Sequence, residues 1–249
     1  MDTNSYTLDN AHPGFSVDCV ILGFHKKKIR VLLTKFDFSK YWQLPGGFMF
    51  KDESSDEVAE RILTERTGLK DIYLKQFYLF SDPKRIGVGQ NNEYIGKSII
   101  LNEEEKKWYL QRFVSLGYYA LVKYDDIQLS KIEDIQTKWF EIDNLPPLCH
   151  DHENIINTSL QMIRSMLPAI PLGRKLLPEK FTMSELRNMY EVILGKKLDR
   201  RNFHRKVITS GLVIQLNETK STSPYNPPIL YTFDKKIKDR LYHPFVLLK

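Results

Sequence analysis

The sequence predicts an α+β chain in two parts, an N-terminal domain of residues 1–167 and a C-terminal winged helix-turn-helix of residues 168–249. In the first part, strand patterns surround one capped helix at about residues 55–67. A proline-marked segment at residues 167–173 then indicates a linker. Beyond it, two capped helices precede two short strand patterns, which is the element order of a winged helix-turn-helix.

Runs of β-branched and aromatic residues predict the strands of the N-terminal domain. The polar segment His25–Lys28 is expected to be a hairpin turn between the first two strands. Residues 86–110 are expected to be an insertion that either covers a cleft or an interface or only decorates the surface. The predicted strands are residues 16–24, 29–35, 71–80, 113–124 and 138–140.

The predicted helix at residues 55–67 carries start and stop signals. Ser54 stands three residues before a glutamate, which is the spacing of a capping box, and Gly68 suits the left-handed residue after a helix end. Between Gly47 and this helix we expect a loop.

This segment resembles the Nudix box, which implies an α/β/α sandwich with a mixed sheet. Two positions depart from the pattern, because Ile62 and Arg66 stand where active members of the family carry the glutamates that hold the catalytic metal. An aliphatic side chain offers no oxygen and a guanidinium group repels a cation. We therefore expect no catalytic residue, no metal, no cofactor and no enzyme activity. The matching positions are Gly47, Glu53, Arg61, Leu63, Glu65, Gly68 and Leu69.

The second helix of the C-terminal part, which Asp199 caps, divides into two faces. Phe203 and Val207 are four residues apart and are expected to face inward. The outward side chains are either a helix for the major groove of DNA or a solvated basic face. Lys220 and Ser221, in the following hairpin, either touch the DNA backbone or minor groove or belong to a plain loop. The predicted DNA-binding residues of the helix are Arg200, Arg201, Asn202, His204, Arg205 and Lys206.

Charge is unevenly distributed along the chain. From Leu172 to Lys249, 16 Lys and Arg residues stand against 7 Asp and Glu residues, a net charge of +9, while the remainder has a net charge of −3. A basic domain favours a polyanion, here double-stranded operator DNA. No signal peptide and no membrane-spanning apolar run is present, and two cysteines are too few for a disulfide framework. We expect a cytoplasmic protein with no membrane partner.

A degenerate Nudix domain followed by a winged helix resembles the bacterial Nudix-related transcriptional regulators. Four short segments, residues 51–54, 118–121, 177–178 and 201–203, look most similar to the Bacteroides-type arabinose-responsive regulator. This resemblance implies a homodimer on a palindromic operator. It also implies a small effector in the inactive Nudix cleft, whose binding releases or rearranges the complex with DNA.

The residues expected around that cleft favour a neutral pentose such as L-arabinose, because carboxylates and an aromatic face suit the hydroxyls and ring of a sugar, whereas a diphosphate requires several cations. ADP-ribose, which the NAD-metabolism branch of the family senses, is the alternative effector. A residual Nudix pyrophosphatase and a protein scaffold are the other functions considered. The predicted ligand-binding residues are Asp18, Lys35, Trp42, Gly46, Gly47, Tyr119, Asp151 and His152.

Overall fold

The structure is a computed structural model that describes residues 9–37, 39–68, 70, 72, 74–85, 111–124, 129, 135–166, 173–220 and 227–235. The insertion at 86–110, most of the predicted linker and Ser221 lie outside these residues. The chain forms two compact units, which are described separately below. The N-terminal unit is Met1–Leu22, Arg30–Ala120 and Ile127–Ser159, and the C-terminal unit is Gly23–Ile29, Leu121–Asp126 and Leu160–Lys249. The predicted boundary between residues 167 and 168 stays a prediction.

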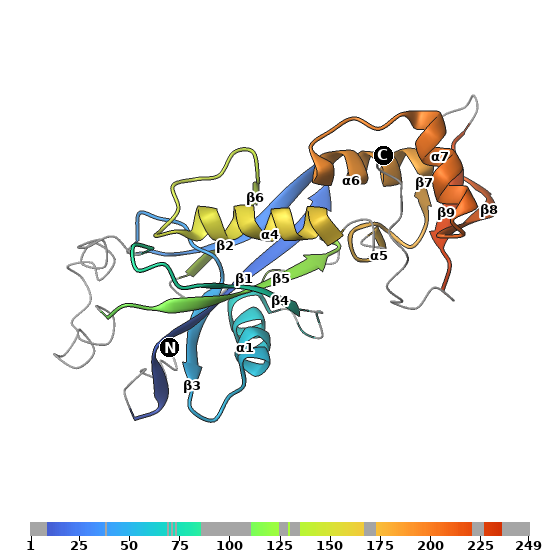
Figure 1. Cartoon of the computed structure of the whole chain (residues 1–249). Coiled ribbons are helices and arrows are strands. Elements are labelled where there is room, and N and C mark those ends of the chain that lie inside the picture. Colours follow the sequence, from blue (N-terminus) through green and yellow to red (C-terminus); the bar gives the residue numbers. More distant parts are fainter. Residues whose placement is uncertain are drawn as a thin grey trace. The chain divides into compact units, whose positions relative to one another are not determined.

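The larger sheet has six strands in the order β4-β5-β1-β2-β6, with β3 paired to β1 (Figure 1). The turn between β1 and β2 contains Lys26 and Lys27 at φ 48° and 63°. Two left-handed residues are what a two-residue hairpin turn needs, so the predicted turn is confirmed. The strands are β1 (Ala11–His25), β2 (Lys28–Phe36), β3 (Gly46–Phe50), β4 (Leu74–Phe80), β5 (Val114–Val122) and β6 (Ile135–Glu141).

Two helices, α1 (Ser55–Thr67) and α4 (His152–Met166), cover opposite faces of this sheet. Cys19 on β1 points towards α1, with its Sγ 3.9 Å from the carbonyl oxygen of Ala59. The preceding residue, Asp18, lies with Oδ1 3.8 Å from Nε2 of His152 at the start of α4. Because successive side chains of a strand point to opposite faces, the sheet lies between the two helices.

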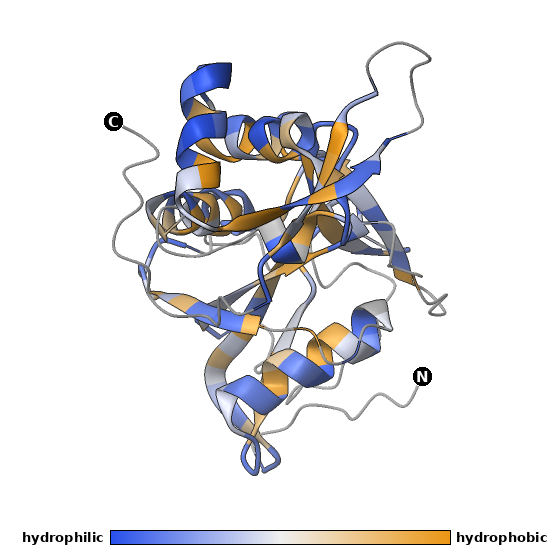
Figure 2. Cartoon of the chain, turned by 90° about the vertical axis from the view of Figure 1, so that its right-hand side faces the viewer, coloured by the Kyte–Doolittle hydropathy of each residue, from blue (hydrophilic) through white to orange (hydrophobic). Residues whose placement is uncertain are grey.

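The predicted bounds of α1 are confirmed, and so is its capping. Ser54 and Glu57 exchange both hydrogen bonds of the capping box, and Gly68 ends the helix at φ 74°. Val58 and Ile62 are buried against the sheet at 0% and 1% exposure. Hydrophobic and hydrophilic residues alternate along this helix accordingly (Figure 2).

The segment before α1 is not the loop that we expected from Phe48 onwards. Gly46–Phe50 is strand β3, in which Gly47 lies opposite Val17 and Phe48 opposite Ser16 of β1. A short run with two glycines and no β-branched residue carries no strand pattern. It is a strand because β1, distant in the sequence, offers its backbone groups as partners.

The C-terminal unit contains the predicted helix-turn-helix and hairpin, and its sheet has the order β7-β9-β8. Phe203 and Val207 are buried as predicted, and the ring of Phe203 lies 5.5 Å from that of Tyr190, between centroids. None of the described helices of the chain is both long and apolar enough to cross a membrane. The elements are α5 (Gly173–Leu176), β7 (Phe181–Thr182), α6 (Met183–Leu194), α7 (Arg200–Thr209), β8 (Val213–Thr219) and β9 (Ile229–Phe233).

Candidate functional site

Four of the eight predicted ligand-binding residues lie together where α4 begins: Asp18, Gly46, Asp151 and His152. Asp18 is the centre of this group. Its Oδ2 accepts a hydrogen bond from the hydroxyl of Ser115, and its Oδ1 lies 3.8 Å from Nε2 of His152. Gly46 pairs with Asp18 across β1 and β3, and a Cβ atom at this position would collide with the Asp18 carboxylate. The glycine is therefore required by the close approach of the carboxylate.

Arg85, which the sequence analysis did not single out, completes this group. Its Nε and Nη2 donate to the two carboxylate oxygens of Asp151 at 3.0 and 2.9 Å, and its Nη1 donates to the carbonyl of Phe113 at 3.1 Å. Nη2 also lies 4.0 Å from Oδ2 of Asp18. The side chain of Arg85 is only 5% exposed. We call Asp18, Arg85, Asp151 and His152 the buried ion network.

The two histidines at this site, His150 and His152, differ in environment. Nδ1 of His152 accepts a hydrogen bond from the backbone N–H of Leu44 at 2.8 Å, which leaves Nε2 to carry the ring proton and to face Asp18. Burial lowers the pKa of His150 to about 4. His150 is therefore neutral at physiological pH. His152 is buried and His150 is neutral, so neither offers an exposed, charged imidazole to a phosphate.

Two further predicted ligand residues, Lys35 and Trp42, form a second group. Nζ of Lys35 lies 5.6 Å from the centroid of the Trp42 ring, and Nζ of Lys138 lies 5.8 Å from it. Phe140 packs edge-on against the same ring at 4.6 Å. Lys138 was missed by the sequence analysis, because one lysine in a strand has no motif. We call Lys35, Trp42 and Lys138 the lysine–tryptophan group.

Gly47 and Tyr119 belong to neither group. Gly47 continues β3 opposite Val17. Tyr119 is 4% exposed on β5, and its ring packs 6.1 Å from that of Phe77. This contact is consistent with a packing role, and the role of Tyr119 in ligand binding stays a prediction.

Within the Nudix box, Arg61 and Glu53 form an ion pair. Nε and Nη2 of Arg61 donate to the carboxylate of Glu53 at 2.5 and 2.8 Å, and Nη2 also donates to the carbonyl of Phe48 at 2.9 Å. Burial raises the pKa of Glu53, but the hydrogen bonds from Arg61 and from the amide of Phe50 outweigh it and hold that pKa below its usual value. Glu53 is thus an ionised partner of Arg61.

The two residues that depart from the Nudix box pattern, Ile62 and Arg66, also have contacts within the chain. Ile62 is 1% exposed in the core, and the guanidinium carbon of Arg66 lies 5.6 Å from the Phe36 ring centroid. Within the described part of the chain, no three His, Cys, Asp or Glu side chains form a group that could hold a metal ion.

The predicted DNA-binding residues of α7 fall on more than one side of the helix. Arg201 and Arg205 are exposed on the side away from Phe203 and Val207, and Nη2 of Arg205 donates to Oδ1 of Asn202 at 3.0 Å. Arg200 is also exposed, and Lys206 is half-buried. His204 turns towards the sheet, with Nε2 3.4 Å from the hydroxyl of Tyr231. Four of the six predicted residues, Arg200, Arg201, His204 and Arg205, are exposed, and the contact of the set with DNA stays a prediction.

Lys220 is engaged within the C-terminal unit. Its Nζ pairs with Oε1 of Glu185, a residue of the α6 capping box. Its backbone N–H donates to the carbonyl of Pro228 at 2.9 Å, which holds the two arms of the hairpin together. The side chain of Lys220 is 42% exposed, so a DNA phosphate can reach it. That phosphate would compete with Glu185 for the ammonium group.

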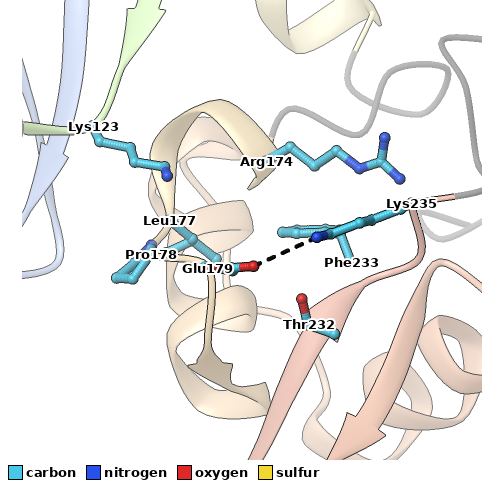
Figure 3. Close-up of a pocket in the computed structure, with 8 residues that line it drawn as sticks. All are labelled: Lys123, Arg174, Leu177, Pro178, Glu179, Thr232, Phe233 and Lys235. Atoms are coloured by element: carbon cyan, nitrogen blue, oxygen red, sulfur yellow. Dashed lines mark ion pairs between the residues drawn. The ribbon is translucent and has the colours of Figure 1, made fainter.

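A pocket of about 330 Å³ lies in the C-terminal unit beside α5 and β9 (Figure 3). Leu177, Pro178 and Phe233 form its apolar wall. Arg174 donates to the backbone carbonyl of Asp234, and Lys235 lies 3.8 Å from Glu179. Its charged groups are thus already engaged, which argues against a strong anion site. The lining residues are Lys123, Arg174, Leu177, Pro178, Glu179, Thr232, Phe233 and Lys235.

Comparison with known families and proteins assigns both parts of the chain. The NUDIX domain model matches residues 12–158, and the model of the NrtR DNA-binding winged helix domain matches residues 173–233. The ADPR responsive transcriptional repressor NtrR of Acinetobacter baylyi is 26% identical over 232 residues, which cover 90% of this chain and 84% of that protein.

Solved structures give the same result. Shewanella oneidensis NrtR in complex with a 27mer DNA has a TM-score of 0.67 and 26% identity, over 88% of this chain and 93% of that one. A MutT/nudix family protein from Enterococcus faecalis has a TM-score of 0.62 and 21% identity, over 90% of this chain and 88% of that one, and supports the fold. The predicted fold class, with its mixed sheet and winged helix, is confirmed. The winged helix matches the NrtR type, so the predicted similarity to the arabinose-responsive type is not supported.

Proposed function

The chain belongs to the NUDIX domain family, and on that premise we propose that it is an ADP-ribose-responsive transcriptional regulator that has no hydrolase activity. One observation carries the proposal: a Nudix domain with Ile62 and Arg66 at the metal positions precedes an NrtR-type winged helix. Without the two glutamates, the box helix lacks the oxygen ligands that a catalytic Mg²⁺ needs. The winged helix supplies a basic helix, α7, that suits the major groove of operator DNA.

ADP-ribose now takes the place of the pentose as the proposed effector. A relative that is similar over 90% of this chain is named as responsive to ADP-ribose, and the winged helix matches the NrtR type. The pentose was favoured because the carboxylates Asp18 and Asp151 were expected to be open to sugar hydroxyls. They are instead engaged with Arg85, Ser115 and His152 in the buried ion network.

The lysine–tryptophan group suits a nucleotide diphosphate better than a sugar. An indole ring can stack on adenine, and the ammonium groups of Lys35 and Lys138, which lie over that ring, offer positive charge for a diphosphate. Trp42 and Lys35 are half-buried and Lys138 is exposed. Arg85, which supplies the guanidinium group of the buried ion network, is already bound to both carboxylate oxygens of Asp151, so it is not free to bind a diphosphate. We therefore assign the diphosphate to Lys35 and Lys138.

We further propose that the protein acts as a homodimer and that ADP-ribose changes its affinity for the operator. The relative is named a repressor, which favours repression as the basal state and release as the response. Coupling between effector and DNA is reciprocal, so DNA must change the affinity for ADP-ribose by the same factor.

Calorimetric titration of the full chain tests the effector. ADP-ribose should bind, while L-arabinose and D-xylose should not, and ADP-ribose incubated with Mg²⁺ should stay intact. Lys138→Gln should weaken binding by about tenfold, since a hydrogen bond to a charged group is worth ~1.5 kcal/mol. The matched control is Lys75→Gln on β4, the opposite edge strand of the same sheet, which should bind as the wild type does.

A second set of titrations tests whether ADP-ribose regulates DNA binding. It uses operator DNA from the region upstream of the protein's own coding sequence. ADP-ribose should change the affinity for DNA measured by fluorescence anisotropy. A sugar that binds in place of ADP-ribose would refute the effector. Hydrolysis of ADP-ribose at ordinary enzyme rates would refute the loss of catalysis, and the absence of DNA binding would refute the regulator.

A further inference from the structure

The outward side of α7 carries one apolar residue among its charged ones. Ile208 lies three residues after Arg205 and seven after Arg201, so the three side chains share one face of the helix. Phe203 and Val207 occupy the opposite, buried face. Ile208 is 38% exposed, and the sequence analysis did not include it in the DNA-binding set.

Position rather than exposure makes this residue informative. Single exposed apolar side chains are common on protein surfaces and need no explanation. Ile214 and Ile229, on the strands of the same unit, are exposed to a similar degree, at 48% and 41%. Ile208 differs from them because it shares a helix face with Arg201 and Arg205, and two guanidinium groups draw this face against a polyanion.

The major groove of DNA contains one apolar group that matches such a side chain. Thymine exposes its C5-methyl group there, and contact with an apolar side chain distinguishes thymine from the other bases. From Arg201 to Ile208 the axis of the helix advances by about 10 Å, which spans about three base-pair steps. The arginines and the isoleucine can therefore address neighbouring base pairs of one half-site.

We propose that Ile208 is a base-reading residue that contacts the C5-methyl group of one thymine in each half-site of the operator. This inference rests on the proposed function, because it requires that α7 enter the major groove. It adds to that function a residue that recognises the base sequence of the operator without a charge and without a hydrogen bond. Ile208 then contributes to specificity and not to the salt dependence of binding.

The test removes the methyl group without changing base pairing. A duplex is selected by the full chain from a random library, and each thymine is then replaced in turn by deoxyuridine. One replacement in each half-site should weaken wild-type binding by about fourfold, which corresponds to ~0.8 kcal/mol for one buried CH₂-sized group. Ile208→Ala should bind the thymine and uracil duplexes equally, and Ile208→Val should keep most of the difference.

Ile214→Ala is the matched control, since it removes a similarly exposed isoleucine from β8 of the same unit, and it should keep the full wild-type response to deoxyuridine. Two results would overturn the assignment: no single deoxyuridine weakens the wild type, or Ile208→Ala keeps the full response. If the library yields no duplex at all, DNA binding itself is refuted together with the inference.

Discussion

The two units of the chain use charged side chains in opposite ways. In the N-terminal unit, Asp18, Arg85 and Asp151 expose no more than 14% of their side chains and are paired with one another. In the C-terminal unit, Arg201 and Arg205 are exposed on one face of α7. The same residue types therefore organise the interior of one unit and prepare the surface of the other for a partner.

This difference predicts where the effect of a mutation will be measured. A buried charge that loses its partner destabilises the fold, because the charge that remains has already lost its hydration. An exposed charge that is removed leaves the fold almost unchanged and weakens the contact with the partner. Stability should report on the buried ion network, and DNA affinity should report on α7.

The largest effect is expected for Arg85→Ala. The change leaves the carboxylates of Asp18 and Asp151 buried without their counter-charge, and we expect the free energy of unfolding to fall by about 3–5 kcal/mol. Urea denaturation followed by circular dichroism measures this. The additional change Asp151→Asn should restore part of the loss, because it removes one of the two uncompensated charges.

The matched control is Arg201→Ala, which removes the same side chain from an exposed helix face. It should alter the free energy of unfolding by less than about 0.5 kcal/mol. Equal losses for the two variants would show that burial does not separate the two sets of charges.

Three of the four residues of the buried ion network could be proposed from the sequence. Asp18, Asp151 and His152 could be proposed because they border the region that the Nudix pattern places around the box. Arg85 could not, because it follows a strand and precedes a glycine-rich segment that matches no motif. Its role comes from contacts with residues distant in the sequence, which a single sequence does not reveal.

The helices were more predictable than the sites because their signals are local. The capping box of α1 and the cap of α7 lie within four residues of the bonds they make, and both were confirmed. Strand β3 was missed because its identity depends on pairing with β1. The split of the ligand set into two groups was missed for the same reason, since it depends on which face of the sheet each side chain occupies.

The second prediction concerns an exposed charge of α7 and its effect on DNA affinity. Arg201→Ala should weaken specific DNA binding by about 1–3 kcal/mol if the guanidinium group pairs with a guanine edge. Anisotropy titrations with the selected duplex, and with the same duplex carrying changed guanines, measure the loss and its position. An unchanged affinity would remove Arg201 from the interface and leave α7 as a solvated basic helix.

The smallest effect is expected for Lys220, which is neither a buried, paired charge nor a fully exposed one. Lys220 is half exposed, yet its ammonium group pairs with Glu185. Burial raises the pKa of Glu185, but the hydrogen bonds from Lys220 and from Thr182 outweigh it and keep that pKa below its usual value. The pair is therefore intact at neutral pH, and Glu185 competes with any phosphate for Lys220.

The variant Glu185→Gln isolates that competition. Glutamine can still serve in the capping box with Thr182, so α6 should keep its cap while Lys220 loses its counter-charge. We expect the slope of log K against log salt to steepen by about 0.9, the value for one added phosphate contact. The double variant Glu185→Gln/Lys220→Ala should return to the wild-type slope. If Lys220→Ala alone makes the slope shallower by that amount, Lys220 already contacts phosphate in the complex, and Glu185 gives it up when DNA binds.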